Sequence, residues 1–188
     1  MSIAKIIHSK KEEKTEFIVV LIFILIGVSL RLIPHLPNFA PVAAIALFGG
    51  VYLRKKIAFT IPLAVMIISD IFIGYYELGL MISVYFSFIL VTILGLWLKR
   101  HKKWYNIGGS AILSAILFFL ITNFAVWKFT PWYPKTAYGL TQCYLMALPF
   151  FKNTLFGNLF YTFCFFGAYE LVKIWIKERF KVSEKNSI

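Results

Sequence analysis

Aspartate is almost absent from this chain of 188 residues, because Asp70 is its only one. Also absent are the GxxxxGK[ST] loop that holds nucleotide phosphates and the HExxH and GxSxG motifs of hydrolases. Membrane hydrolases need a nucleophile with a base, or two acids, and no second acid lies at the depth of Asp70. We therefore expect a protein that does not hydrolyse ATP on its own, is not an enzyme and holds no cofactor or metal.

Cysteine is scarce as well. Cys143 and Cys164 are the only two, and they lie in different segments without forming a CxxC pair. Neither a disulfide framework nor a zinc site follows from them. We expect both to be ordinary packing residues.

Charged residues make up only 15% of the chain, whereas 60% of its residues are hydrophobic and occur in long blocks. A soluble fold would show amphipathic stripes instead. The connections between the apolar blocks carry the net charge of +12, which is the pattern of membrane orientation signals rather than of nucleic-acid binding. The composition predicts an all-α integral membrane bundle in contact with the lipid bilayer and without a nucleic-acid partner.

About 20 apolar residues cross the hydrocarbon core of a bilayer. On this basis we expect six membrane-spanning helices, at residues 17–32, 39–53, 57–76, 78–98, 107–129 and 154–176. Between the last two lies a long connection, 130–153. Its apolar piece, 140–151, is too short and too broken by Pro149 to be a span of its own.

Lysine and arginine fall unevenly on the two sides of these spans, with sixteen of the twenty on one side. The positive-inside rule then places both termini in the cytoplasm, which requires an even number of spans. The segment 140–151 is accordingly expected as an interfacial or re-entrant helix on the outer face. We expect one transmembrane domain, 1–188, with cytoplasmic tails at 1–16 and 177–188, in a multi-pass protein of the cell membrane.

Asp70 lies within the apolar run 57–76, at a depth where an ionised group is costly unless it faces a polar cavity or a partner. The upstream segment 31–50 places proline, histidine and asparagine between two hydrophobic stretches. Helix-breaking polar residues beside a buried acid indicate a ligand-binding site. The alternative is a structural ion pair between Asp70 and either Arg31 or Lys128.

Most polar residues of the expected bundle fall in its outer half, where a pocket lined by aromatic and amide side chains would suit a small organic ligand. The candidate ligand-binding residues are His35, Asn38, Asp70, Tyr85, Asn123, Trp127, Tyr133, Asn153 and Asn158. Trp127 and Tyr133 also fit an interfacial aromatic belt. Asn123 and Asn158 also suit hydrogen bonds between helices, and His35 also suits a solvated loop.

Small residues form a second pattern near the start of the short second span. Ala40 and Ala44 are spaced i, i+4, which on a helix makes a flat face that another helix can approach closely. We expect this face to dock a partner helix. The alternative is packing against a neighbouring span of the same chain.

Four segments carry a family resemblance: RLIPHLPNFAPVAAIALFGG at 31–50, ISDIFIG at 68–74, LPFFKNTLFGN at 148–158 and FFG at 165–167. They resemble the substrate-binding S components of energy-coupling factor (ECF) vitamin transporters. They resemble more closely a set of small, less characterised transport proteins related to those subunits. The similarity covers most of residues 28–170.

This resemblance implies an S-component-like bundle of six helices with both termini inside and a ligand near Asn38 and Asp70. It also implies that Ala40 and Ala44 dock onto a membrane scaffold subunit driven by two ATPases. The implied function is uptake of a vitamin-sized nutrient or precursor, as a subunit or alone. One branch of that family takes up cobalamin through an outer-side cysteine, and residues 75–90 here contain none. A membrane scaffold or assembly protein with a structural polar cluster is the alternative.

Overall fold

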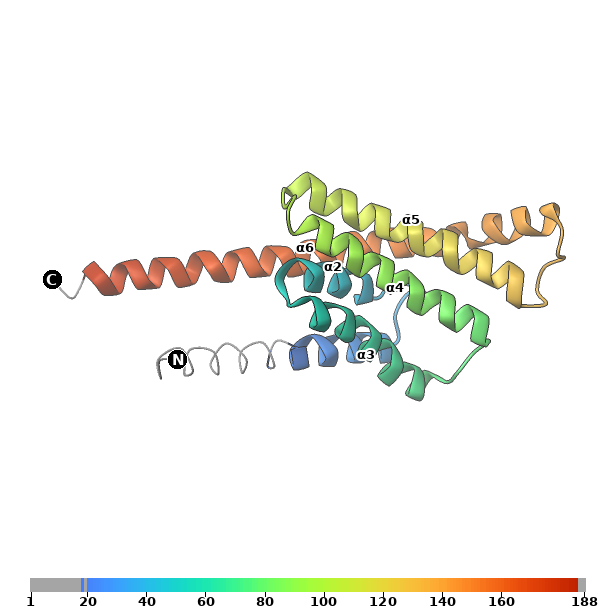
Figure 1. Ribbon diagram of the computed structural model, residues 1–188, viewed down its shortest axis with the longest axis horizontal. Coiled ribbons are helices and arrows are strands. Elements are labelled where there is room, and N and C mark those ends of the chain that lie inside the picture. The colour runs from blue at the N-terminus through green and yellow to red at the C-terminus, as the bar shows by residue number, and fades with distance from the viewer. Residues whose placement is uncertain (1–17, 19, 186–188) are drawn as a thin grey trace.

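The computed structural model describes Ile18 and residues 20–185, with side chains described as far as Trp175. The regular structure in this range is entirely helical, which confirms the all-α class (Figure 1). A first helix, Val20–Leu32, precedes five further helices. These are α2 (Val42–Tyr52), α3 (Lys55–Ile73), α4 (Leu78–Leu98), α5 (Trp104–Phe129) and α6 (Ala137–Lys185). The expected N-terminal tail, 1–16, lies outside the described residues.

Four helices are long and apolar enough to cross a membrane. They are α3, α4, α5 and the part of α6 from Ala137 to Trp175. The expected span 78–98 coincides with α4, and the spans 57–76 and 107–129 agree with α3 and α5 to within three residues at each end. The first helix and α2 are apolar but shorter.

The long helices turn large apolar side chains outward and small or hydroxyl-bearing ones inward. Phe72 on α3 is 70% exposed and Phe156 on α6 is 63% exposed. Thr92 and Ser114, by contrast, are fully buried. Each donates its hydroxyl to the carbonyl one turn earlier, at 2.9 and 2.7 Å. An apolar exterior around a core of small residues is the packing of membrane helices.

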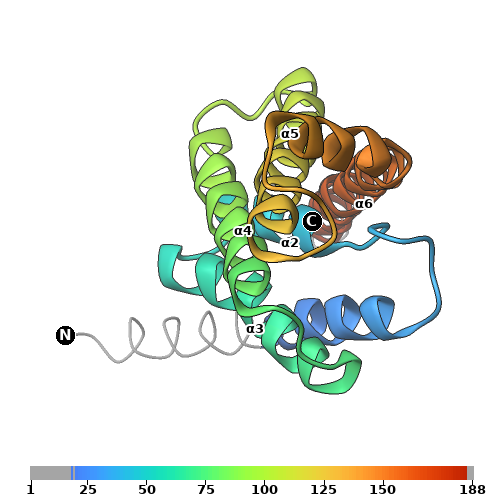
Figure 2. The same ribbon diagram turned by 90° about the vertical axis from the view of Figure 1, so that its right-hand side faces the viewer.

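The short helix α2 forms the centre of the bundle. Every residue from Val42 to Val51 is buried, and α2 contacts α3, α4, α5 and α6. Seen end-on, α4, α5 and α6 lie to one side of α2, and α3 with the first helix lies to the other (Figure 2). A Cβ atom at Gly50 would lie 2.6 Å from the carbonyl carbon of Gly95. Glycine at both positions therefore lets α2 and α4 cross backbone to backbone.

The expectation of a long connection at 130–153 is wrong. Helix α6 runs without a break from Ala137 to Lys185, so it includes the segments 140–151 and 154–176 and the first part of the expected tail 177–188. Pro149 removes one N–H from this helix, but packing on α5 compensates. Tyr144 Oη donates to Leu120 O at 2.7 Å. The true connection is 130–136.

The helices alternate in direction, so the bundle has two different ends (Figure 1). The first, called the site end, holds the loops 33–41, 74–77 and 130–136. The opposite end, called the cationic end, holds the connections 53–54 and 99–103. At or beside those connections lie Arg54, Lys55, Lys56, Lys99, Arg100, Lys102 and Lys103.

Candidate ligand-binding site

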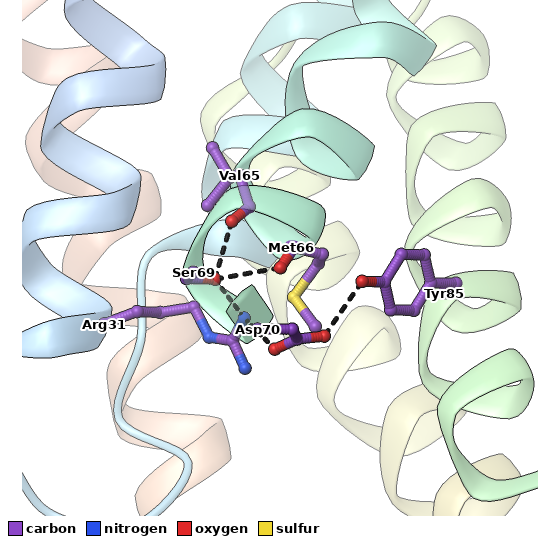
Figure 3. A network of polar contacts seen from close by, with 6 residues as sticks. All are labelled: Arg31, Val65, Met66, Ser69, Asp70 and Tyr85. Atoms are coloured by element: carbon purple, nitrogen blue, oxygen red, sulfur yellow. Dashed lines mark hydrogen bonds and ion pairs between the residues drawn. The ribbon is translucent and has the colours of Figure 1, made fainter. Parts of the chain in front are cut away.

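A buried polar network ties three helices together near the site end (Figure 3). Asp70, near the end of α3, is 0% exposed. Arg31, in the last turn of the first helix, donates from Nη1 to Asp70 Oδ1 at 2.9 Å and also to Ser69 Oγ. Tyr85 Oη of α4 donates to Asp70 Oδ2 at 2.9 Å. Both carboxylate oxygens are thus satisfied, and Arg31 is the observed partner of the two cations considered from the sequence.

The end of α3 fixes the position of this network. Gly74 has φ 103°, a left-handed conformation that glycine adopts freely, and its N–H caps α3 by donating to Asp70 O at 2.9 Å. Tyr76 follows in the loop 74–77. Its burial, together with the nearby negative charge of Asp70, raises the pKa of Tyr76 to about 12. The phenol therefore stays neutral at physiological pH.

A cavity of about 170 Å³, the site cavity, opens beside the network. Its polar lining comes from Arg31, His35, Asn38, Thr154 and Asn158. Eight apolar residues complete the wall, including Phe88 and Phe118, whose ring centres are 5.5 Å apart. Arg31 lines the cavity, whereas Asp70, which is bonded to Arg31, is not part of the lining. The cation, rather than the aspartate, is therefore the group that a molecule in this cavity would contact, and Asp70 holds Arg31 in position.

A second cavity of about 210 Å³, the side cavity, adjoins the first. The two share the lining residues Asn38, Val84, Phe118 and Thr154, and the side cavity adds Tyr76 and Asn123, among others. Together they reach the lower end of the size range of small-molecule pockets, about 300–1,000 Å³.

The loop 33–41 carries two of the lining residues and is tied to α6. Asn38 has φ 64°, a conformation that asparagine tolerates better than most residues. Asn153 Nδ2 donates to the carbonyl of the preceding Pro37 at 3.1 Å. The Nδ1 atom of His35 lies 2.7 Å from Ile33 O, so this nitrogen carries the proton that the carbonyl accepts. One hydrogen bond from α6 and one within the loop thus hold this polar segment beside the cavity.

Asn158 on α6 is the least satisfied polar residue of the site cavity. It is 3% exposed, and its Nδ2 atom has no hydrogen-bond partner. A buried donor without a partner costs about 1–3 kcal/mol. Such groups are few in native proteins, and each calls for an explanation such as a binding role or an unseen water.

The structure separates the predicted site residues into three groups. His35, Asn38 and Asn158 line the site cavity, and Asn123 lines the side cavity. Asp70, Tyr85 and Asn153 hold other parts of the site in place. Trp127 Nε1 donates to Pro134 O at 2.9 Å and so fastens the loop 130–136. Tyr133 belongs to that loop and lines neither cavity.

The sequence pattern does not indicate every residue of the site. It indicates Arg31 only as a partner of Asp70, yet Arg31 lines the site cavity. The signal was present, because a cation that pairs with the lone acid at membrane depth must lie at the same site. Phe88 and Phe118 carried no such signal among the twenty phenylalanines of the chain.

Ala40 and Ala44 were expected to share one helical docking face, but α2 begins only at Val42, so Ala40 lies in the loop 33–41 and the two form no common helical face. Ala44 is 0% exposed, and Ala40 lines the site cavity. In this arrangement Ala44 offers no surface to another protein, because α2 is surrounded by α3, α4, α5 and α6. Internal packing, the alternative, is what the structure shows at Ala44.

A larger cavity of about 500 Å³, the cationic-end cavity, lies at the opposite end of the bundle. Lys102 Nζ lies 3.2 Å from Glu170 Oε1 and 3.0 Å from Tyr52 Oη. Tyr52 Oη in turn donates to Glu170 Oε1 at 3.3 Å. These contacts join the connection 99–103 to α2 and α6, and nothing in the sequence predicted them.

Among the described residues, no three His, Cys, Asp or Glu side chains are grouped closely enough to hold a metal ion. Residues 11–181 match the family described as DUF6580, a family of unknown function. No curated protein and no solved structure matches the chain. Because the match extends over most of its length, the chain belongs to the DUF6580 family.

Proposed function

We propose that this protein is a multi-pass transport protein of the cell membrane. It binds a small, vitamin-sized nutrient or precursor on the outer side and carries it into the cell. The observation behind this proposal is that Arg31 is both the partner of buried Asp70 and a wall of the site cavity. Ionised residues at membrane depth are rare and mark substrate pathways. If this ion pair served stability alone, apolar side chains in the same places would serve equally well.

In the proposed orientation, the cationic end faces the cytoplasm and the site end faces outward, in accordance with the positive-inside rule. The chain then crosses the bilayer six times, with the loop 33–41 completing the crossing begun by the short α2, and both termini lie inside. The loop 33–41 and the two adjoining cavities open toward the exterior. A nutrient reaches the site cavity from the outside without passing the cationic end.

The charges of the site favour an uncharged ligand. Arg31 and Asp70 neutralise each other, and the remaining polar lining residues are histidine, threonine and two asparagines. An arginine has five N–H donors, and its contacts to Ser69 and Asp70 come from Nη1 alone. We therefore propose a neutral molecule with hydrogen-bond acceptors for Arg31 and a flat apolar part against Phe88 and Phe118.

The chain acts in this proposal as an S-component-like binding subunit, with an ECF-type scaffold and its ATPases supplying the energy, or alone. One observation favours a structural alternative, a membrane scaffold or assembly protein. Asp70 has both of its oxygens satisfied within the chain, as a purely structural network requires. The two functions differ in whether a small molecule is bound.

Mass spectrometry of the full chain, purified in mild detergent, tests the proposal. We expect one small molecule to co-purify with the wild type. Asn158→Leu should lose it at equal folded yield, because this change replaces a polar lining residue of the site cavity. Gln142→Leu is the matched control on the same helix, since Gln142 lines neither cavity at the site end, and it should retain the molecule. Recovery of partner proteins but no small molecule would favour the scaffold alternative.

A further inference from the structure

We infer that the transported molecule passes through the protein itself, along the interface of α2 and α6. We further infer that Phe48, Thr162 and Phe166 form the barrier in the middle of this route. The inference rests on the proposed transport function. It concerns only the route, and the experiment below separates the two.

Both ends of the α2–α6 interface open into a cavity. At the site end, Ala43 of α2 and Asn158 of α6 line the site cavity. At the cationic end, Tyr52 of α2 and Phe166 of α6 line the cationic-end cavity. The same two helices therefore border both cavities.

The wall between the cavities is thin. Ala43 and Tyr52 are nine positions apart on α2, which corresponds to a rise of about 14 Å. Asn158 and Phe166 are eight positions apart on α6, which corresponds to about 12 Å. The two helices give similar values, close to half of the roughly 30 Å hydrocarbon core. A molecule in either cavity has thus already covered part of the distance across the membrane.

Helix α6 presents a series of residues at every fourth position along this interface: Thr154, Asn158, Thr162, Phe166 and Glu170. Residues four apart lie one above the other on successive turns. The first two line the site cavity and the last two line the cationic-end cavity. Thr162 lies between the pairs.

The hydroxyl of Thr162 is enclosed and unpaired. Thr162 is 0% exposed, and Asn158 Nδ2 and Thr162 Oγ1 are the two enclosed side-chain polar atoms without a partner among the described residues. Thr92 and Thr122, also buried, donate to the carbonyl one turn earlier. A buried hydroxyl that makes no such bond costs about 1–3 kcal/mol. A polar molecule or water that passes between the cavities supplies the missing partner.

Aromatic rings close the route in this structure. Phe48 and Phe166 are 5% and 0% exposed, and their ring centres lie 5.4 Å apart in an edge-to-face arrangement. On the cationic side, the contacts among Tyr52, Lys102 and Glu170 join α2 to α6 and to the connection 99–103. Passage therefore requires α2 and α6 to separate at the rings and then at these polar contacts.

Cysteine labelling in sealed vesicles tests the barrier. Thr162→Cys is placed in a Cys143→Ala/Cys164→Ala background and treated with a membrane-impermeant cationic methanethiosulfonate. We expect almost no labelling in the resting protein and at least tenfold faster labelling after Phe166→Ala is added. Phe163→Cys, at the neighbouring position and 43% exposed on the outer surface of the bundle, is the matched control. It should stay unlabelled in both backgrounds because lipid covers it.

Phe48→Leu opens the same barrier from the opposite helix and replaces Phe166→Ala if that variant does not fold. A labelling rate at Thr162→Cys that neither substitution changes would overturn the inferred route. If uptake of the co-purifying molecule nevertheless persists, the proposed function stands and the molecule crosses by another path. Fast labelling in the opened variants without any uptake by the wild type would support the barrier and contradict the transport function.

Discussion

Replacing Asp70 with asparagine should destabilise the fold, because the charge of Arg31 would then be left without its counter-ion. Removal of one partner from a buried ion pair costs about 3–5 kcal/mol. The Arg31 side chain is 17% exposed, so we expect a cost at the lower end of this range, about 3 kcal/mol. Arg31→Gln should cost a similar amount, since it leaves the fully buried Asp70 with only Tyr85 as a partner among these groups.

The double variant Arg31→Gln/Asp70→Asn should cost about 3 kcal/mol rather than the sum of about 6, because neither charge then remains buried and unpaired. The assay is unfolding of the purified full chain by SDS in mixed micelles, followed by tryptophan fluorescence. Lys128→Gln is the control, since Lys128 is exposed and its replacement should change stability by less than about 0.5 kcal/mol. Additive costs in the double variant would refute the coupling between Arg31 and Asp70.

Three further predictions follow from the packing and the cationic end. Gly50→Ala should lower folded yield, because its Cβ would lie 2.6 Å from the backbone of α4 and prevent α2 from packing there. Gly109→Ala is the control and should be tolerated, because no atom lies within 4 Å of its Cβ. Ala44→Leu should overfill the core at a cost of about 1–3 kcal/mol and reduce ligand binding and uptake together; loss of uptake alone would instead indicate a docking face. Burial by itself lowers the pKa of Lys102, but hydrogen bonds to Tyr52 and Glu170 raise it above the ordinary 10.5. The stability advantage of the wild type over Lys102→Met should therefore be complete between pH 4.5 and pH 10.5. It should disappear as the pH rises through the raised pKa of Lys102, as pH-dependent unfolding curves will show.

The positions of the long helices could be predicted because each follows an apolar block bounded by charges or turn residues. Helix α4 is the clearest case, with bounds equal to the predicted ones. The continuity of α6 could not be predicted in this way. Pro149 disfavours a helix locally, whereas the contacts that hold this part of α6 come from another helix, α5. Local preference was thus outweighed by tertiary packing that the sequence pattern does not reveal.

The candidate site was predicted in its composition but not in its geometry. His35, Asn38 and Asn158 line the site cavity, as expected for polar residues that lipid would exclude. The sequence could not show that Asp70 lies behind Arg31, because either partner of an ion pair can face a cavity. It also could not show that α2 is buried on all sides, since an apolar helix has the same composition in lipid and in a protein core.

The length of α2 has a consequence for the depth of the binding pocket. Its eleven residues make a helix of about 16 Å, whereas its long neighbours continue toward the site end. The space beyond the first turn of α2 is left to the loop 33–41 and the site cavity. The pocket thus occupies the space that a longer α2 would fill, and the first turn of α2 forms the inner end of the pocket. One added helical turn before Val42 would make the pocket about 5.4 Å shallower, whatever side chains it carried.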